Sequence, residues 1–163
     1  MQTRRFTQLP RLALAILFTM LVGSAAADNS TLEGTWDVTL RFPGETCDRT
    51  ECSCPGNTPN IPLPTLNTFL KGGGMVWSGS ALAVGPGQGV WERFERHHYV
   101  ARLKFFIFNP ETGFRTGSEE LTKDIRLTGP DTFEATTTYD LLDAAGNMTA
   151  QGCLINESAT RFE

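Results

Sequence analysis

The sequence predicts an all-β protein that folds as an eight-stranded antiparallel up-and-down barrel. Beyond the first 27 residues, short segments of alternating apolar and polar residues are separated by clusters of Gly, Pro and Asn. No long stretch shows the 3.6-residue period of a helix. Most of the eight predicted strands are joined by hairpin-length turns, and a meander of eight strands can close on itself and remove its unpaired edges.

Residues 1–27 have the pattern of a signal peptide. Three arginines precede an apolar run from Leu12 to Val22, which at about 11 residues is shorter than the ~20 of a membrane span. Small residues then form a cleavage site that ends at Ala27. We therefore expect a secreted or periplasmic protein, cleaved near Ala27, with one barrel domain over residues 28–163.

The predicted mature chain is acidic. The signal segment carries three of the 14 Lys and Arg residues, which leaves 11 against 18 Asp and Glu and a net charge of about −7. Binding to a phosphate backbone needs a basic surface, so we expect no nucleic-acid partner. No second long apolar run follows the signal segment, so no membrane insertion is expected.

Each predicted strand follows from alternation and ends at a turn signal. The first strand is expected at 34–42, and a long loop at 43–64 holds three cysteines and five prolines. Three consecutive glycines follow a strand at 65–71, and a glycine-rich loop at 85–89 separates strands at 75–84 and 90–96. The other strands are expected at 98–108, 116–128, 132–142 and 148–156, with turns at 109–113, 129–131 and 143–147.

Alternation also predicts which side chains face the interior. The inward set comprises Trp36, Val38, Leu40, Phe42, Met75, Trp77, Gly79, Ala81, Tyr99, Ala101, Leu103, Phe105, Ile107, Phe133, Ala135, Thr137, Tyr139 and Leu141. Phe106 and Phe108 break this alternation, because they are apolar residues at positions that should face outward. Either a β-bulge shifts the phase, or both rings face outward and form a surface for self-association.

The segment Gly34-x-Trp36 and the late Arg161 resemble the lipocalin signature. In lipocalins the Trp closes one end of the barrel, and an Arg from near the C-terminus lies across its ring. The resemblance covers the first strand and the C-terminal tail, and it implies a lipocalin-like (calycin) barrel in which Trp36 and Arg161 are structural. It further implies that the first strand pairs antiparallel with the last.

The mature chain also resembles a group of uncharacterised secreted bacterial barrel proteins. The shared segments are Trp36-x-Val38, Gly85–Trp91, Phe105–Phe108, Gly152-Cys153 and Arg161-Phe162. This resemblance supports the barrel fold and implies no function.

Four cysteines, an even number in an exported chain, suggest disulfide bonds. The spacing of Cys47, Cys52 and Cys54 is not that of a zinc site and no His lies near, so we expect no metal. If Trp36 lies opposite Arg161, residue numbers across this strand pair sum to about 197, which brings Cys153 close to Cys47. We expect Cys47–Cys153 and Cys52–Cys54, while Cys47–Cys52 with Cys54–Cys153 stays open.

Several inward side chains either line a ligand cavity or fill the core. The candidates are Trp77, Trp91, Tyr99, Leu103, Phe105, Lys123 and Tyr139. Lys123 is in phase with apolar neighbours, so it either faces inward, where Glu119 or a ligand carboxylate would pair with it, or is solvated because the phase slips. We favour the solvated position. His97 and His98 follow a predicted turn and are also expected to be solvated.

The pattern favours a barrel that binds a small apolar or amphipathic molecule, without catalysis and without a cofactor. One alternative is an isomerase like allene oxide cyclase, in which an apolar cavity shapes a reactive ligand. The other is a protein-binding barrel, such as a periplasmic protease inhibitor, acting through its N-terminal arm or the 43–64 loop. Converging ionisable groups in the interior would favour the enzyme, and a filled core with exposed apolar loops would favour the inhibitor.

Overall fold

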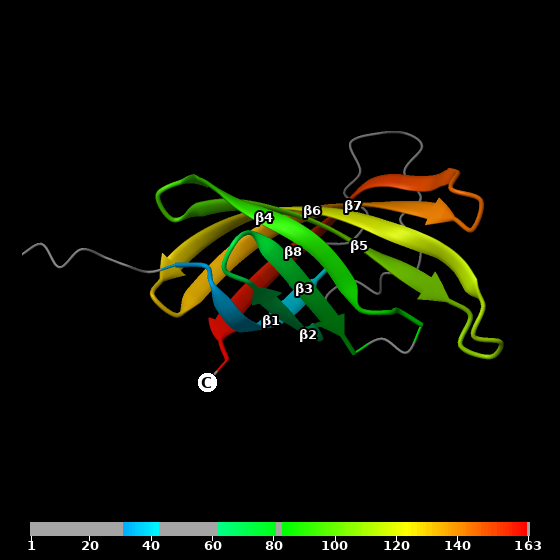
Figure 1. Cartoon of the computed structure of the whole chain (residues 1–163), viewed down its shortest axis with the longest axis horizontal. Coiled ribbons are helices and arrows are strands. Elements are labelled where there is room, and N and C mark those ends of the chain that lie inside the picture. The colour runs from blue at the N-terminus through cyan, green and yellow to red at the C-terminus, as the bar shows by residue number, and fades with distance from the viewer. Residues whose placement is uncertain (1–30, 43–61, 81–82, 163) are drawn as a thin grey trace, which may run out of the picture.

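Eight antiparallel strands form a closed barrel in the computed structural model, which describes residues 31–42, 62–80 and 83–162. Each strand pairs with the next along the chain, and the last pairs with the first (Figure 1). The predicted all-β, up-and-down fold is therefore confirmed. The strands are β1 (Gly34–Arg41), β2 (Leu63–Phe69), β3 (Gly74–Gly79), β4 (Gly87–Glu95), β5 (His98–Phe108), β6 (Arg115–Gly129), β7 (Thr132–Asp143) and β8 (Met148–Arg161).

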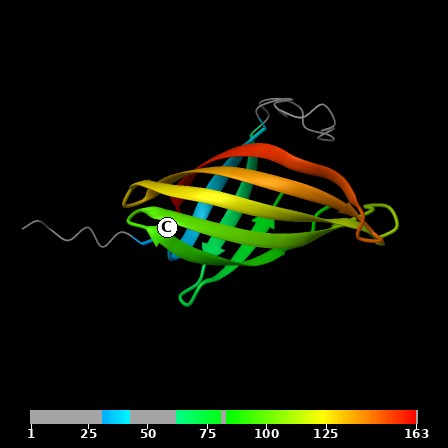
Figure 2. The ribbon, with the colours of Figure 1, turned by 90° about the horizontal axis from the view of Figure 1, so that it is seen from above.

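The strands fall into a long and a short group. The four strands β5 to β8 run side by side, and the short strands β1 to β3 cross them at a steep angle (Figure 2). The β5–β6 and β7–β8 hairpins extend past the short strands at one end of the molecule (Figure 1). The barrel interior therefore lies between a long wall, formed by β5 to β8, and a short wall, formed by β1 to β3.

Three strand limits differ from those predicted by three residues or more. β3 ends at Gly79 rather than at 84, β4 begins at Gly87 inside the predicted 85–89 loop, and β8 continues past 156 to Arg161. The glycines at 85–89 predicted a loop because glycine is common in turns. Gly89 instead belongs to β4 and lies opposite Leu103, where the β5 backbone comes too close for any Cβ. The end of β8 pairs on one side with β1 and on the other with β7. These two pairings stabilise the strand beyond residue 156, where the local sequence pattern did not predict one.

The closure between β1 and β8 has the register expected from the sequence. Trp36 lies opposite Arg161, and the guanidinium carbon of Arg161 is 4.2 Å from the centroid of the Trp36 ring. The buried indole donates a hydrogen bond to the carbonyl of Leu32 at 2.9 Å. Gly34 has φ +123°, and a Cβ there would lie 2.7 Å from Nη1 of Arg161, so the Gly-x-Trp segment needs its glycine.

The core beside this closure is aromatic. Trp36 contacts Phe133 edge-to-face with ring centroids 5.0 Å apart, and Phe133 contacts Phe69 at 6.2 Å. The predicted inward residues on β1, β5 and β7 are buried or half-buried, which confirms the alternation, while Ala81 lies outside the described residues. Burial of these rings is the main contribution that the interior makes to stability.

The broken alternation on β5 has a local cause. The β5–β6 register shifts between Ile107 and Phe108, which is the predicted bulge, and the Phe108 ring packs over Gly85. Phe106 stays on the outer face, 44% exposed, with Arg115 above its ring at 5.5 Å. Self-association through Phe106 and Phe108 stays a prediction.

Candidate functional site

A buried ion pair lies inside the barrel, on the long wall. Lys123 on β6 donates to Oε1 of Glu157 on β8, and both side chains are 0% exposed. Thr137 on β7, also buried, donates to the same oxygen at 2.6 Å. Thr137 lies opposite Lys123 in the β6–β7 register and beside β8, so three adjacent strands supply the cluster.

The expected solvated position of Lys123 is wrong, and so is Glu119 as its hydrogen-bonding partner. The β6–β7 register runs unbroken from Gly117 to Leu127, so the phase does not slip and Lys123 stays inward. Its partner Glu157 was missed because the last strand was expected to end at 156. Glu157 is in phase with the buried Ile155 and Ala159, and this signal would have revealed it if the strand had been extended.

Several buried polar atoms have no hydrogen-bond partner in the described part of the chain. They are Oε2 of Glu157, both side-chain polar atoms of Asn67, Nε1 of Trp77, Oη of Tyr99 and Oγ1 of Thr65. Asn67 is 0% exposed and lies opposite Trp77 on the inner face of β2 and β3. An unpartnered buried polar atom costs about 1–3 kcal/mol, and a bound polar group removes that cost.

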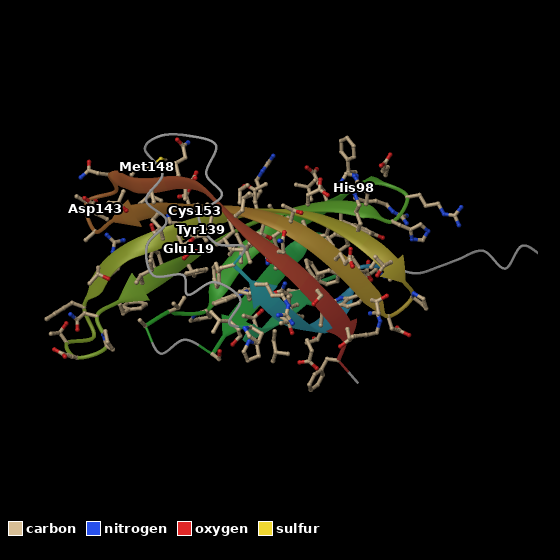
Figure 3. All side chains as sticks on the ribbon, turned by 180° about the vertical axis from the view of Figure 1, so that it is seen from behind. His98, Glu119, Tyr139, Asp143, Met148 and Cys153 are labelled. Atoms are coloured by element: carbon tan, nitrogen blue, oxygen red, sulfur yellow. The ribbon has the colours of Figure 1, made fainter. Side chains whose placement is uncertain are left out.

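Glu119 is a half-buried carboxyl group on the same face of β6 as Lys123. Its backbone pairs with Phe105 on one side and Leu141 on the other. Burial raises the pKa of Glu119 from 4.5 to about 7, and the positive charge of Lys123 opposes the rise. Figure 3 places Glu119 near Tyr139 and Cys153 and far from His98. The inner face of β6 therefore carries, two inward positions from Lys123, a carboxyl group whose pKa is raised to about 7.

The aromatic candidates form two groups. Trp77 stacks on Phe105 with centroids 4.8 Å apart and rings 13° from parallel, and a Cβ on Gly87 would touch Trp77, Phe105 and Leu103 together. The Trp77 indole lies over Gly79, where a Cβ would be 2.1 Å from the ring. Tyr139 is buried one inward position beyond Thr137 on β7.

The other two candidates lie nearer the Trp36 end. Trp91 packs against Tyr99 at 5.7 Å and against Phe69 at 6.1 Å, and its indole donates to the carbonyl of Leu70 at 3.0 Å. The role of all seven candidates in ligand binding stays a prediction.

His98 is buried, so its expected solvated position is also wrong. The ring lies 2.9 Å from Asp124 and 3.3 Å from Glu95, and the edge of Phe94 packs against it at 5.1 Å. This cluster is on the outer face of the barrel because Asp124 alternates with the inward Lys123. His97 occupies the β4–β5 turn with φ 60°.

An open hollow of about 460 Å³ lies on the outer face, over β1, β6, β7 and β8. Its lining carries charges of both signs, from Arg41, Arg126, Asp124 and Glu134, and it also includes Glu157. Asp143, in the β7–β8 hairpin, is a second carboxyl group with a shifted pKa. The hydrogen bond that the Asn147 side chain donates to it lowers this pKa and orders the turn. The interior cluster is therefore the candidate site.

The cysteine predictions fall largely outside the described residues. Cys153 is fully buried on β8, opposite Tyr139, and is not a free thiol. Cys47, Cys52 and Cys54 lie outside the described residues, as does the predicted signal peptide. The pairing stays a prediction, to be decided by mapping peptides of the non-reduced protein; a free thiol at Cys153 would contradict it.

The described ranges show neither a metal centre nor a membrane-spanning helix. No group of His, Cys, Asp or Glu side chains there is arranged to hold a metal ion. No described segment forms a helix with the length and hydropathy of a membrane span. Neither a protein-family model nor a curated protein matches this chain.

Proposed function

We propose that this chain is a secreted, lipocalin-like barrel that binds a small amphipathic ligand in its interior. The observation that carries the proposal is the buried Lys123–Glu157 pair with one carboxylate oxygen unpartnered. Desolvation offsets most of the attraction in a buried ion pair, so apolar residues would make the barrel at least as stable. The charges are therefore better explained by recognition than by stability.

The surroundings of the pair have the composition of a small-molecule site. Such sites have mostly apolar and aromatic walls with a few polar groups that orient the ligand. Here the Trp77–Phe105 stack and Leu103 supply the walls, while Glu157 and Asn67 supply polar atoms without protein partners. An eight-stranded barrel is also just wide enough to hold one small ligand.

The test is recovery of a ligand followed by measurement of its affinity. Native mass spectrometry of the protein purified from its own source should show a retained small molecule. A hydrophobic fluorescent probe should bind saturably at one site, and Trp77→Ala should weaken it about tenfold or more. Val90→Ala, on the exposed outer face of β4, is the matched control and should leave affinity unchanged.

Loss of probe binding in a Trp77 variant that has also lost its fold would be uninformative, so Phe105→Leu is measured beside it. This variant keeps an apolar side chain and removes only the stacked ring. Absence of saturable binding by the folded parent protein would refute the proposal.

An inward-facing carboxyl group with a raised pKa supports a second candidate, a barrel isomerase like allene oxide cyclase. Glu119, with a pKa of about 7, can exchange a proton with a bound molecule at neutral pH. If so, the recovered ligand should be converted on incubation, and Glu119→Gln should stop the conversion. Glu120→Gln, one residue away on the outer face, is the control. An unchanged ligand would reject the enzyme and leave the binding function.

A further inference from the structure

A row of four side chains crosses the outer face of the long wall, with one residue from each of β5 to β8. Phe106 lies opposite Ser118 in the β5–β6 register. Ser118 lies opposite Leu142, and Leu142 lies opposite Met148. Residues that are directly paired across antiparallel strands have their side chains on the same face of the sheet, and Phe106 is on the outer face. The four residues therefore form one continuous line, which we call the outer row.

The outer row is apolar and partly exposed. Phe106 is 44% exposed and Met148 52%, and Leu142 is half-buried. Ser118, which lies between the Phe and the Leu, is only 6% exposed, so no exposed polar side chain interrupts the row. Phe108, the other ring expected on this surface, lies beyond the β-bulge and is not part of the row. Contiguous exposed apolar side chains indicate contact with another molecule, whereas single ones do not.

Opposite charges lie on the two sides of the outer row. On the side of the hairpin ends, the guanidinium carbon of Arg115 is 5.5 Å from the centroid of the Phe106 ring, and Nη2 donates to the carbonyl of Ala144 at 2.7 Å. On the other side, the carboxylate of Glu120 lies 2.8 Å from the ammonium of Lys104. The row is therefore flanked by a cation at one edge and an ion pair at the other.

The acidic residues nearby make this difference larger. Asp140 lies opposite Glu120 in the β6–β7 register, so the side with Lys104 carries one net negative charge. The nearest acids on the side of Arg115 are Glu111, in the β5–β6 turn, and Asp143, whose carboxylate is hydrogen-bonded within the β7–β8 turn. The groups directly beside the row are therefore positive on one side and negative on the other.

This arrangement is complementary to itself. A two-fold axis along the outer row places each apolar side chain on its counterpart in a second copy and reverses the strand direction. Arg115 of each copy then faces Glu120 of the other, and such a contact is made twice because the interface is isologous. Opposite charges across an interface favour the matching partner and register.

We propose that the outer row is the contact surface of a reversible two-fold dimer of this chain. A row of four residues is smaller than the ~800 Å² per partner of a standard stable interface, so the dimer dissociates on dilution. The surface lies on the outer face of the barrel, and its test does not depend on the ligand proposed for the interior.

Sedimentation velocity of the full mature protein, over about 5 to 500 µM, measures the association. The sedimentation coefficient should rise with concentration from that of a monomer towards that of a dimer. Met148→Ser should weaken the dimer by about tenfold, because it removes exposed apolar area from the row. Val90→Ser is the matched control: this side chain is 62% exposed on the outer face of β4, and its loss should change the dimer Kd by less than about twofold.

Two charge-reversed variants test the orientation of the copies. Arg115→Glu and Glu120→Arg should each weaken the homodimer by about tenfold or more, because like charges then face each other twice. In an equimolar mixture of the two variants, both contacts of the mixed dimer join opposite charges again. The mixture should therefore associate more tightly than either variant alone. Both side chains are exposed, so both variants should fold, which melting curves verify.

Each outcome bears on the proposal. A parent protein that stays monomeric at the highest concentration overturns it and leaves the row to a different partner. A dimer that Met148→Ser does not weaken, or that Val90→Ser weakens equally, overturns the assignment to this face. A mixture that associates no better than the single variants overturns the two-fold arrangement.

Discussion

Replacing Arg161 by Ala removes the side chain that joins β8 to the residues just before β1, Thr31 and Glu33. Its guanidinium lies 4.2 Å from the Trp36 ring and donates to the carbonyls of Glu33 at 2.8 Å and Thr31 at 3.0 Å. It also pairs with Asp131 at 2.9 Å. The side chain is 28% exposed, so these contacts are only partly screened by solvent.

These contacts give the expected loss of stability. The partly desolvated cation–π contact is worth about 1–2 kcal/mol. The two carbonyl hydrogen bonds add roughly 1 kcal/mol each, and the exposed pair with Asp131 adds about 0.5 kcal/mol or less. Arg161→Ala should therefore lower the free energy of unfolding by about 3–4 kcal/mol, and Tm by roughly 10–15 °C for a domain of this size.

Urea and thermal denaturation followed by circular dichroism measure this change. Arg161→Lys keeps the charge but not the planar fork, so it should recover only about half of the loss. Arg126→Ala, at a position whose side chain is 61% exposed with ion contacts of 3.7 and 3.9 Å, is the control and should cost less than about 0.5 kcal/mol. A loss at Arg161 no larger than at Arg126 would refute this account of the closure.

Three further changes test the interior. Lys123→Met alone should cost about 3–5 kcal/mol because the carboxylate is left unpaired, while the double variant with Glu157→Leu should be as stable as the parent or more so. Because burial raises the pKa of Glu119 to about 7, the folded protein holds this proton more tightly than the unfolded chain, whose pKa is 4.5. Stability should then fall as the pH rises from about 4.5 to 7, by less than about 3 kcal/mol since the group is half-exposed. Gly79→Ala puts a Cβ 2.1 Å from the Trp77 ring, so it should cost about 1–3 kcal/mol and change the near-ultraviolet circular dichroism.

Each of these has a contrary result. A double variant as unstable as Lys123→Met would show that the pair itself stabilises the barrel. A decline with pH that persists in Glu119→Gln would show that Glu119 does not cause it. An unchanged near-ultraviolet spectrum in Gly79→Ala would mean that the indole does not occupy the space over that glycine.

The sequence by itself determined the strands, their meander order and their inward faces. These follow from local properties: a two-residue alternation, and turns of Gly, Pro and Asn. The pairing of Trp36 with Arg161 was also readable, because a short signature carries it. Since alternation is a property of each strand alone, it placed Trp36, Val38 and Tyr99 inward without any knowledge of their neighbours.

Only the tertiary structure decided which inward side chains meet. Lys123 and Glu157 are 34 residues apart, on strands separated by β7, so their contact depends on two strand registers and on the extension of β8. His98 is similarly buried by Asp124 from the neighbouring strand, 26 residues away. A buried charge is tolerated only when its partner is in place, and that partner is set by the closure of the whole barrel rather than by the local sequence.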